Sequence, residues 1–304
     1  MLLQNNIPIR YIIGKIKPGL IAVTIYAVVI AALYNTFHFT RITIPISVPM
    51  ILGTVISLLL GFRSNQAYDR WWEARVIWGA IVNDSRNLGR QILTFVDGYD
   101  SVEAQQFRER FIRRQMGWTF CLSRHLRKEK PLTNLKAYML EEEIKYISGY
   151  SNAPAAILEL HGKDIAYALE MGWINQYQQV SLDQTLSKLC DAMGKCERIK
   201  NTVFPATYSL YIHFAMNLFI MMLPFGLIEY FGFIEIPVVI AIAASFMLIE
   251  KMAIHLQDPF ENKPTDTPMT TISKGIEKDL KQMLNDYSIL EENDTVHKKA
   301  YYLL

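Results

Sequence analysis

The chain offers few side chains at spacings that could do chemistry. Its three cysteines, Cys121, Cys190 and Cys196, contain no CxxC pair, which argues against a disulfide framework and against a tetrahedral zinc site. The histidines lack metal-ligand spacing, and no glycine-rich nucleotide loop, H-E-x-x-H or G-x-S-x-G motif occurs. The sequence therefore predicts a protein that is not an enzyme, with no bound metal and no cofactor.

Two histidines, His38 and His213, lie within long apolar stretches, where a polar group is a functional candidate. The favoured alternative is structural, with His38 at the membrane interface and a packed His213 bonded to a neighbouring helix. A basic run at 108–130 is interleaved with glutamates, so it predicts a solvated or subunit-contact face. Because the net charge is only +2, we expect no nucleic-acid partner.

The elements that would position these side chains are mainly apolar. Hydrophobic residues make up 51% of the 304 residues and charged residues only 20%, which is unusual for a soluble domain. The apolar runs at 18–40, 42–62, 201–228 and 231–249 can each cross most or all of roughly 30 Å of hydrocarbon. We expect four transmembrane helices, the fourth being the weakest because Glu235 interrupts it.

The charges between the spans predict their orientation. Residues 1–17 carry Arg10, Lys15 and Lys17, whereas residues 229–235 carry no lysine or arginine. By the positive-inside tendency, both termini and the middle of the chain lie in the cytoplasm. The first apolar run is too long for a signal peptide and a second run follows it, so we expect it to be a membrane span.

Helical periodicity dominates the water-soluble part, which we place at 63–200. One predicted stripe comprises Leu182, Leu186, Leu189, Cys190, Met193 and Cys196. The expected segments are 1–62 with the first two spans, a cytoplasmic helical domain at 63–200, two more spans at 201–254, and a cytoplasmic C-terminal segment at 255–304. This pattern predicts an all-α, polytopic membrane protein.

The second span has two unusual features. No proline occurs from Leu58 to Val96, so the span can continue out of the membrane as one long helix; a separate amphipathic juxtamembrane helix is equally compatible. Thr54, Leu58 and Phe62 also form one stripe at fourfold spacing, and Gln66 continues it.

This stripe suggests how ions could cross. Spans one and two contain no Asp, Glu, Lys or Arg, and four helices leave little room for water, so several copies would have to surround one axis. Rings of the stripe residues would form an apolar constriction that gates by excluding water. Packing of the same stripe against another span is the alternative, and periodicity alone favours it.

The run FRSNQAYDRWWEARVIWG (Phe62–Gly79) resembles the bestrophin family, especially its bacterial members. GKCERIKNTVFPATYS (Gly194–Ser209) and HLQDPF (His255–Phe260) resemble the family's segments before the third span and after the fourth. With four apolar blocks in the same order, the resemblance covers nearly the whole chain. It implies a homopentameric ion channel in the cytoplasmic membrane of a prokaryote, with membrane lipid around it.

The resemblance also implies roles for individual residues. The family's three-ring neck falls on Thr54, Leu58 and Phe62, and a cytoplasmic constriction falls near Tyr177. Thr54 stands where a larger apolar residue is usual, which makes Phe62 the best gate candidate. The residues expected to anchor the helix at the interface and to pair between subunits are Arg70, Trp71, Trp72, Glu73 and Arg75.

Selectivity depends on which charges reach the pore. The resemblance to bacterial members favours monovalent cations, and Gln66 and Asp69 are the candidate selectivity residues, unless Arg70 neutralises Asp69. A chloride channel of the same fold and a non-conducting scaffold are the alternatives.

Calcium is the one metal that the resemblance raises. Animal bestrophins bind it in a clasp whose positions include Asp258 and Asp266, but Lys263 replaces an acid there and the acidic run that follows in those proteins is absent. Calcium requires six to eight oxygen ligands, so we predict no high-affinity site.

Overall fold

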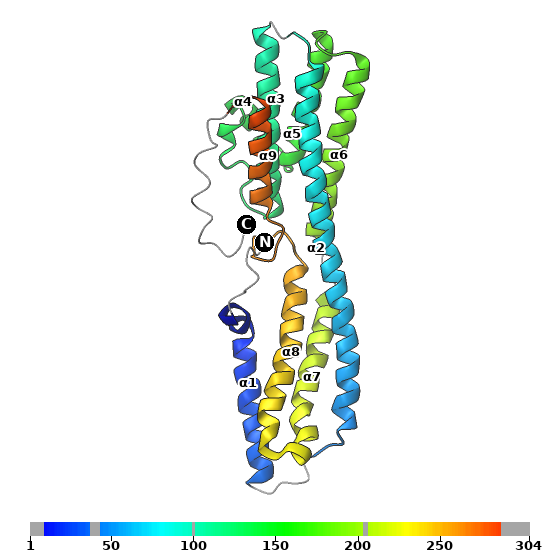
Figure 1. Ribbon diagram of the computed structural model, residues 1–304, viewed down its shortest axis with the longest axis vertical. Coiled ribbons are helices and arrows are strands. Elements are labelled where there is room, and N and C mark those ends of the chain that lie inside the picture. Colours follow the sequence, from blue (N-terminus) through cyan, green and yellow to red (C-terminus); the bar gives the residue numbers. More distant parts are fainter. Residues whose placement is uncertain (1–8, 37–42, 99–100, 203–205, 287–304) are drawn as a thin grey trace. The chain divides into compact units, whose positions relative to one another are not determined.

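The computed structural model describes residues 9–36, 43–98, 101–202 and 206–286. Over these residues the chain forms α-helices and two short 3-10 helices, with no strand (Figure 1). The predicted all-α fold is therefore confirmed. His38 lies outside the described residues.

The described chain forms two units. One holds Trp72–Asn201 and the described residues from Pro259 onward, and we call it the helical body; the other holds the described residues up to Trp71 with Thr202–Asp258, and we call it the apolar unit. The four expected segments stay a prediction. The helices are α1 (Ile9–Asn35), α2 (Ser47–Phe95), α3 (Val102–Leu126), α4 (Glu141–Ser148), α5 (Ala153–Glu170), α6 (Gln176–Asn201), α7 (Ala206–Phe231), α8 (Glu235–Leu256) and α9 (Met269–Met283), with 3-10 turns at Leu135–Ala137 and Gly232–Ile234.

Three helical stretches of the described chain are long and apolar enough to cross a membrane, namely Gly14–Asn35, Ser47–Phe95 and Thr207–Leu256. The second is the single helix α2, which confirms the uninterrupted helix and excludes a separate juxtamembrane one. The third contains α7 and α8, joined by the 3-10 turn at Gly232–Ile234. Gly232 has a φ of 52°, a left-handed conformation that glycine adopts without a steric penalty.

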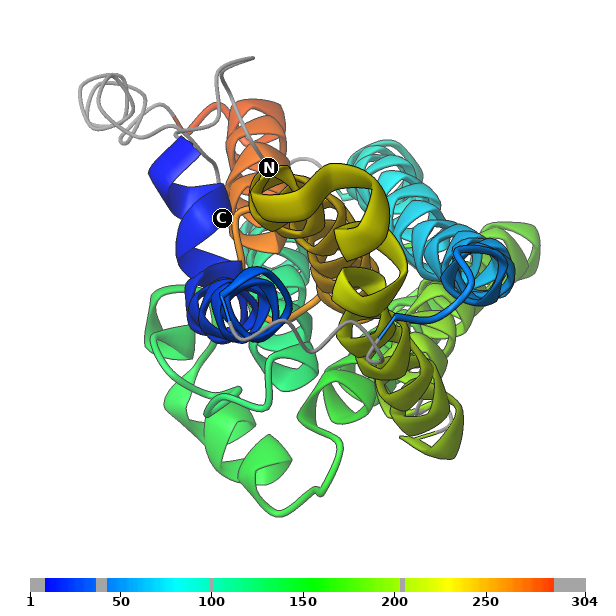
Figure 2. The same cartoon turned by 90° about the horizontal axis from the view of Figure 1, so that it is seen from below.

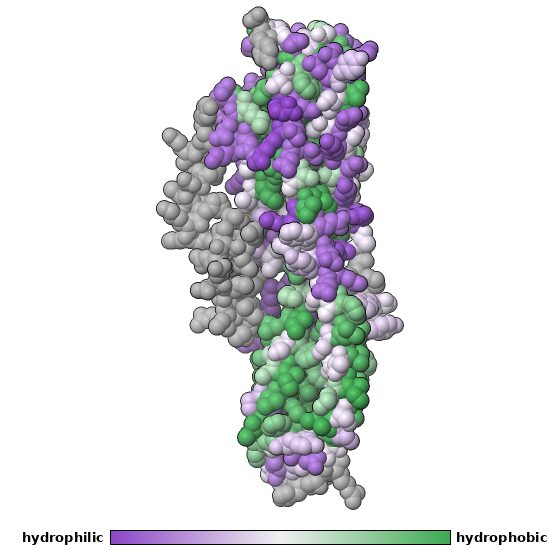
Figure 3. All heavy atoms as spheres, turned by 45° about the vertical axis from the view of Figure 1, so that its right-hand side comes forward, coloured by the Kyte–Doolittle hydropathy of each residue, from purple (hydrophilic) through white to green (hydrophobic). Residues whose placement is uncertain are grey.

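In the apolar unit, α8 packs against α1 and α7, which also contact each other, and Figure 2 shows these helices end on. α2 approaches α7 closely, because a Cβ atom on Gly53 would lie 2.9 Å from the ring of Phe219. On the face shown in Figure 3, hydrophobic residues cover most of this unit, whereas hydrophilic residues gather over the helical body. This surface suits a hydrocarbon environment.

The helical body has its own core, with Trp78, Phe111 and Trp118 fully buried. The α6 stripe is buried as predicted except at Cys190, which is exposed. That part of the prediction is wrong because position 190 lies about 80° around the helix from Leu182, at the edge of the buried face.

The basic run also differs from expectation. Arg108 and Arg114 are only 6% and 2% exposed, so part of the run is core rather than solvated surface. Arg114 is buried because it pairs with two carboxylates, those of Asp164 at 2.7 Å and of Glu143.

Candidate pore-lining site

α2 presents two different faces within the apolar unit. Ile56, Leu60 and Ala67 are buried against the other helices, whereas the residues of the predicted stripe all face outward. The exposed fractions of Leu58 and Phe62 are 61% and 54%. Since the stripe residues do not pack within the chain, they are available to lipid, to another copy or to a pore.

The polar members of this helix are satisfied locally. The Thr54 hydroxyl donates to the carbonyl of Met50 at 2.9 Å, and the Ser57 hydroxyl donates to that of Gly53 at 2.7 Å. A hydroxyl engaged in this way has less need of water. Thr54 is therefore less polar at the exposed surface than its type suggests.

Asp69 and Arg70, which follow the stripe, are adjacent in sequence but have different surroundings. Gln66 and Asp69 are exposed, and no ion pair to Asp69 occurs in the described parts of the chain. Arg70 turns away, donating from Nε to the carbonyl of Gln257 at 3.0 Å and from Nη1 to that of Thr202 at 2.9 Å. The Asp69 charge therefore remains on the same side of α2 as Phe62.

Trp71 and Trp72 also differ in their exposure. Trp71 is half-buried, with its ring centroid 5.8 Å from that of Tyr68, whereas Trp72 is 55% exposed. Glu73 pairs with Arg198 of the same chain. Arg75 is half-buried.

Tyr177 lies at the beginning of α6 in the helical body and is 89% exposed. Asn175 and Gln178 cap this end reciprocally, each side-chain oxygen accepting from the other's backbone N–H at 2.9 Å and 2.8 Å respectively. The start of the helix is thus fixed while the Tyr177 side chain stays free of the core.

The two expected clasp positions fall in different units. Asp258 belongs to the apolar unit and Asp266 to the helical body, where its Oδ2 accepts from the backbone N–H of Lys263 at 3.0 Å. The side chain of Lys263 contacts Glu261. No group of three or more metal-ligating side chains occurs among the described residues, and the absence of a high-affinity calcium site stays a prediction.

A buried charge network lies behind the stripe and was not predicted from the sequence. Arg63, the residue after Phe62, and Glu250 of α8 are both 2% exposed, and their Nη1 and Oε1 atoms lie 3.8 Å apart. His213 Nδ1 lies 2.9 Å from the same Glu250 oxygen. The predicted bond from His213 to a neighbouring helix is confirmed. The expected packing of His213 is wrong, because its side chain is 54% exposed.

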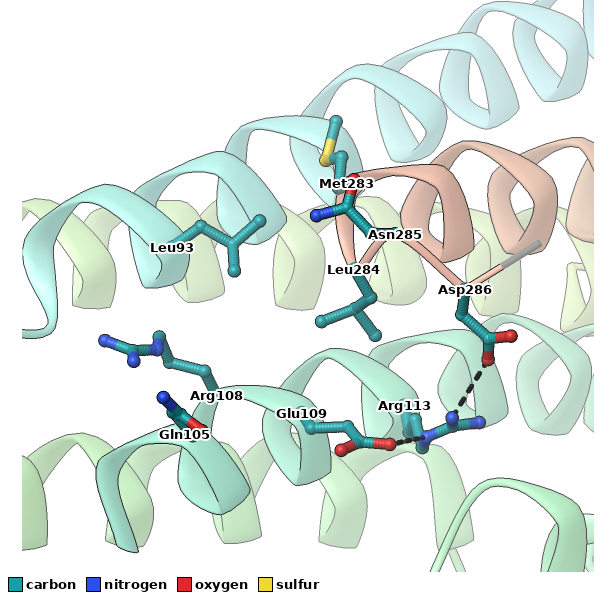
Figure 4. Close-up of a pocket in the computed structure, with 9 residues that line it drawn as sticks. All are labelled: Leu93, Gln105, Arg108, Glu109, Arg113, Met283, Leu284, Asn285 and Asp286. Atoms are coloured by element: carbon teal, nitrogen blue, oxygen red, sulfur yellow. Dashed lines mark hydrogen bonds and ion pairs between the residues drawn. The ribbon is translucent and has the colours of Figure 1, made fainter. Parts of the chain in front are cut away.

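A pocket of about 820 Å³ opens in the helical body between α2, α3 and the end of α9 (Figure 4). Two arginines line it: Arg113 donates to Glu109 at 2.8 Å and to Asp286 at 3.0 Å, and Arg108 donates to the carbonyl of Val96 at 2.8 Å. Both guanidinium groups are therefore engaged within the chain, and we assign no role to this pocket.

Comparison with known proteins adds three findings. A family model described as bacterial/fungal bestrophin protein matches residues 9–282. Proteins named voltage-dependent anion channel-forming protein from Nostoc sp. and from Escherichia coli strain K12 are each 30% identical to this chain. The first alignment covers 94% of this chain and 91% of the relative, and the second covers 91% and 90%.

A solved structure is also similar over most of its length. The crystal structure of a bacterial bestrophin homologue from Klebsiella pneumoniae has a TM-score of 0.83 and 26% identity to this chain. The match covers 88% of this chain and 98% of that one.

Proposed function

Because this chain belongs to the bacterial and fungal bestrophin family, a family of ion channels rather than enzymes, we propose that it forms a homopentameric channel for monovalent ions, lined by α2. The observation that carries the proposal is the outward-facing stripe of Thr54, Leu58 and Phe62, which no part of the described chain covers. Five copies around one axis would turn each position into a ring. Those rings would form an apolar neck that conducts only when it is hydrated.

The proposed topology has four crossings per subunit, with α7 and α8 forming a hairpin around the turn at Gly232–Ile234. Both termini and the helical body would lie in the cytoplasm, and the protein would be a multi-pass component of the cytoplasmic membrane in contact with lipid. Tyr177, exposed at the beginning of α6, would line a second constriction.

Cations are the proposed permeating ions. Asp69 is exposed on the stripe side of α2, and Arg70 donates to backbone carbonyls instead of to Asp69. A ring of five carboxylates below an uncharged neck would raise the local concentration of cations. Gln66 lies between the neck and this ring.

Anion conduction is the second candidate, and the names of the relatives favour it. The relatives from Nostoc sp. and Escherichia coli are named as anion channel-forming proteins. The uncharged neck residues are compatible with either sign, so selectivity would depend on the charges beyond the neck.

The test is planar-bilayer recording of purified protein whose oligomer mass has been measured. Under a tenfold salt gradient, ideal cation and ideal anion selectivity give reversal potentials of about 59 mV with opposite signs. We expect a potential on the cation side that moves towards zero in Asp69→Asn. A potential on the anion side would replace the cation proposal with the second candidate.

The neck is tested with Phe62→Ala, which should raise the conductance or the open fraction because it removes the largest side chain of the proposed neck. Val55→Ala is the matched control, since Val55 is 50% exposed on the same helix but lies off the stripe. Equal currents in the two variants would remove Phe62 from the gate. A confirmed pentamer that stays silent even as Phe62→Ala would favour a non-conducting scaffold.

A further inference from the structure

The charge network behind the neck joins three helices of the apolar unit. Arg63 comes from α2, Ser209 and His213 come from α7, and Glu250 comes from α8. Buried charges are costly in an apolar environment unless they are paired, so these contacts hold the three helices in register. Arg63 directly follows Phe62, and the network therefore fixes α2 at the proposed gate.

Two cationic groups converge on one carboxylate oxygen. Glu250 Oε1 lies 2.9 Å from His213 Nδ1 and 3.8 Å from Arg63 Nη1, while Arg63 Nη2 donates to the Ser209 hydroxyl at 3.2 Å. Tyr208 of α7 is a further titratable group near Arg63. The longer Arg63 contact is the one more easily lost to competition.

One member of the network reaches the surface of the described chain. The His213 side chain is 54% exposed, whereas those of Arg63 and Glu250 are each 3% exposed. Imidazole is also the side chain whose charge ordinarily changes between about pH 5 and 8. A proton on His213 places a full positive charge against the oxygen that Arg63 shares.

We propose that His213 is a proton-binding positioning residue that makes the Phe62 neck sensitive to pH. Protonated His213 draws Glu250 Oε1 away from Arg63, which loosens α2 beside Phe62 and raises the open fraction. This inference rests on the proposed channel function, because it takes Phe62 as the gate.

The test is bilayer recording at about pH 8 and about pH 5.5, either side of the range in which imidazole titrates. Acidification should raise the open fraction of the parent protein about fivefold, at the lower end of typical coupling between two sites. His213→Gln should abolish this response. The matched control is His125→Gln, which removes a second histidine–glutamate pair among the described residues, His125 with Glu197 at 3.4 Å in the helical body.

A second measurement follows the accessibility of position 62 to a thiol reagent and needs no ionic current. In a Cys190→Ser background, where Cys121 and Cys196 remain buried, Phe62→Cys is modified by a small methanethiosulfonate reagent at each pH. Adding His213→Gln should slow the modification at pH 5.5 and leave it unchanged at pH 8.

The two measurements separate this inference from the channel proposal. If no variant conducts but His213→Gln slows modification only at acidic pH, the network stands and the channel proposal fails. If currents are normal and His213→Gln keeps the parent's pH response in both measurements, the inference is overturned and the channel proposal remains.

Discussion

The buried side chain of His161 should lower the free energy of unfolding of the helical body at acidic pH. Its imidazole is fully buried on α5, with its centroid 4.2 Å from the ring of Phe111, and neither ring nitrogen has a hydrogen-bond partner within the described residues. Burial, reinforced by the positive charge of Arg114, holds the pKa of His161 well below its ordinary value of 6.5. The folded chain therefore keeps this side chain neutral.

The sign follows from proton binding in the two states. Below pH 6.5 the unfolded chain takes up a proton at His161 that the folded chain refuses, so the free energy of unfolding falls as the pH falls. The loss is about 1.4 kcal/mol for each pH unit. Between pH 6.5 and pH 5 this one group removes about 2 kcal/mol from the stability.

The perturbation is His161→Phe, which keeps a ring against Phe111 and removes no hydrogen bond. Urea unfolding, followed by tryptophan fluorescence between pH 8 and pH 5, should show a shallower loss of stability in the variant, by about 2 kcal/mol at pH 5. His161→Gln should flatten the pH dependence equally but lower the stability at every pH by about 1–3 kcal/mol, because it removes the ring that packs against Phe111. Identical pH slopes in the parent and in His161→Phe would refute the reasoning.

Two further predictions concern the same unit. Arg114→Met should lower the free energy of unfolding by about 3 kcal/mol, because it leaves two largely buried carboxylates without this partner. Arg113→Met, in a more exposed pair, should cost less than about 1 kcal/mol, and equal losses in one urea titration would contradict the argument. A thiol reagent at pH 8 should label Cys190 alone, since burial raises the pKa of both Cys121 and Cys196 to about 12. An adduct on either buried cysteine in the folded protein, detected by mass spectrometry, would argue against that burial.

Local periodicity was enough to predict much of the fold. The absence of proline after Leu58 indicated that α2 could be one long helix. The spacing of Leu182, Leu189 and Cys196 indicated the buried face of α6. Both features depend on neighbours along one helix, so a sequence pattern can carry them. The outward face of the Thr54–Phe62 stripe is different, because periodicity alone favoured packing against another span.

Pairing between distant helices could not be predicted in this way. Arg63 and Glu250 each end an apolar run, and nothing in either run indicates that the two share a buried site with His213. Arg114 belonged to a run that was expected to be solvated, yet its carboxylate partners come from α4 and α5. The sequence contains these charges but not the tertiary contacts that decide whether they are buried.

Tertiary contacts also determine which charges of the run around Arg70 could affect ion selectivity. Consecutive helical residues point about 100° apart, so Asp69 and Arg70 belong to different surfaces although they are adjacent in sequence. Arg70 holds the carbonyls of Thr202 and Gln257 within the chain, while Asp69 stays on the side of Phe62. The summed charge of the run is therefore a poor guide to the charge that an ion would meet. What matters is which side chains the fold has already engaged, and on α2 the unengaged charge next to the proposed neck is the negative charge of Asp69.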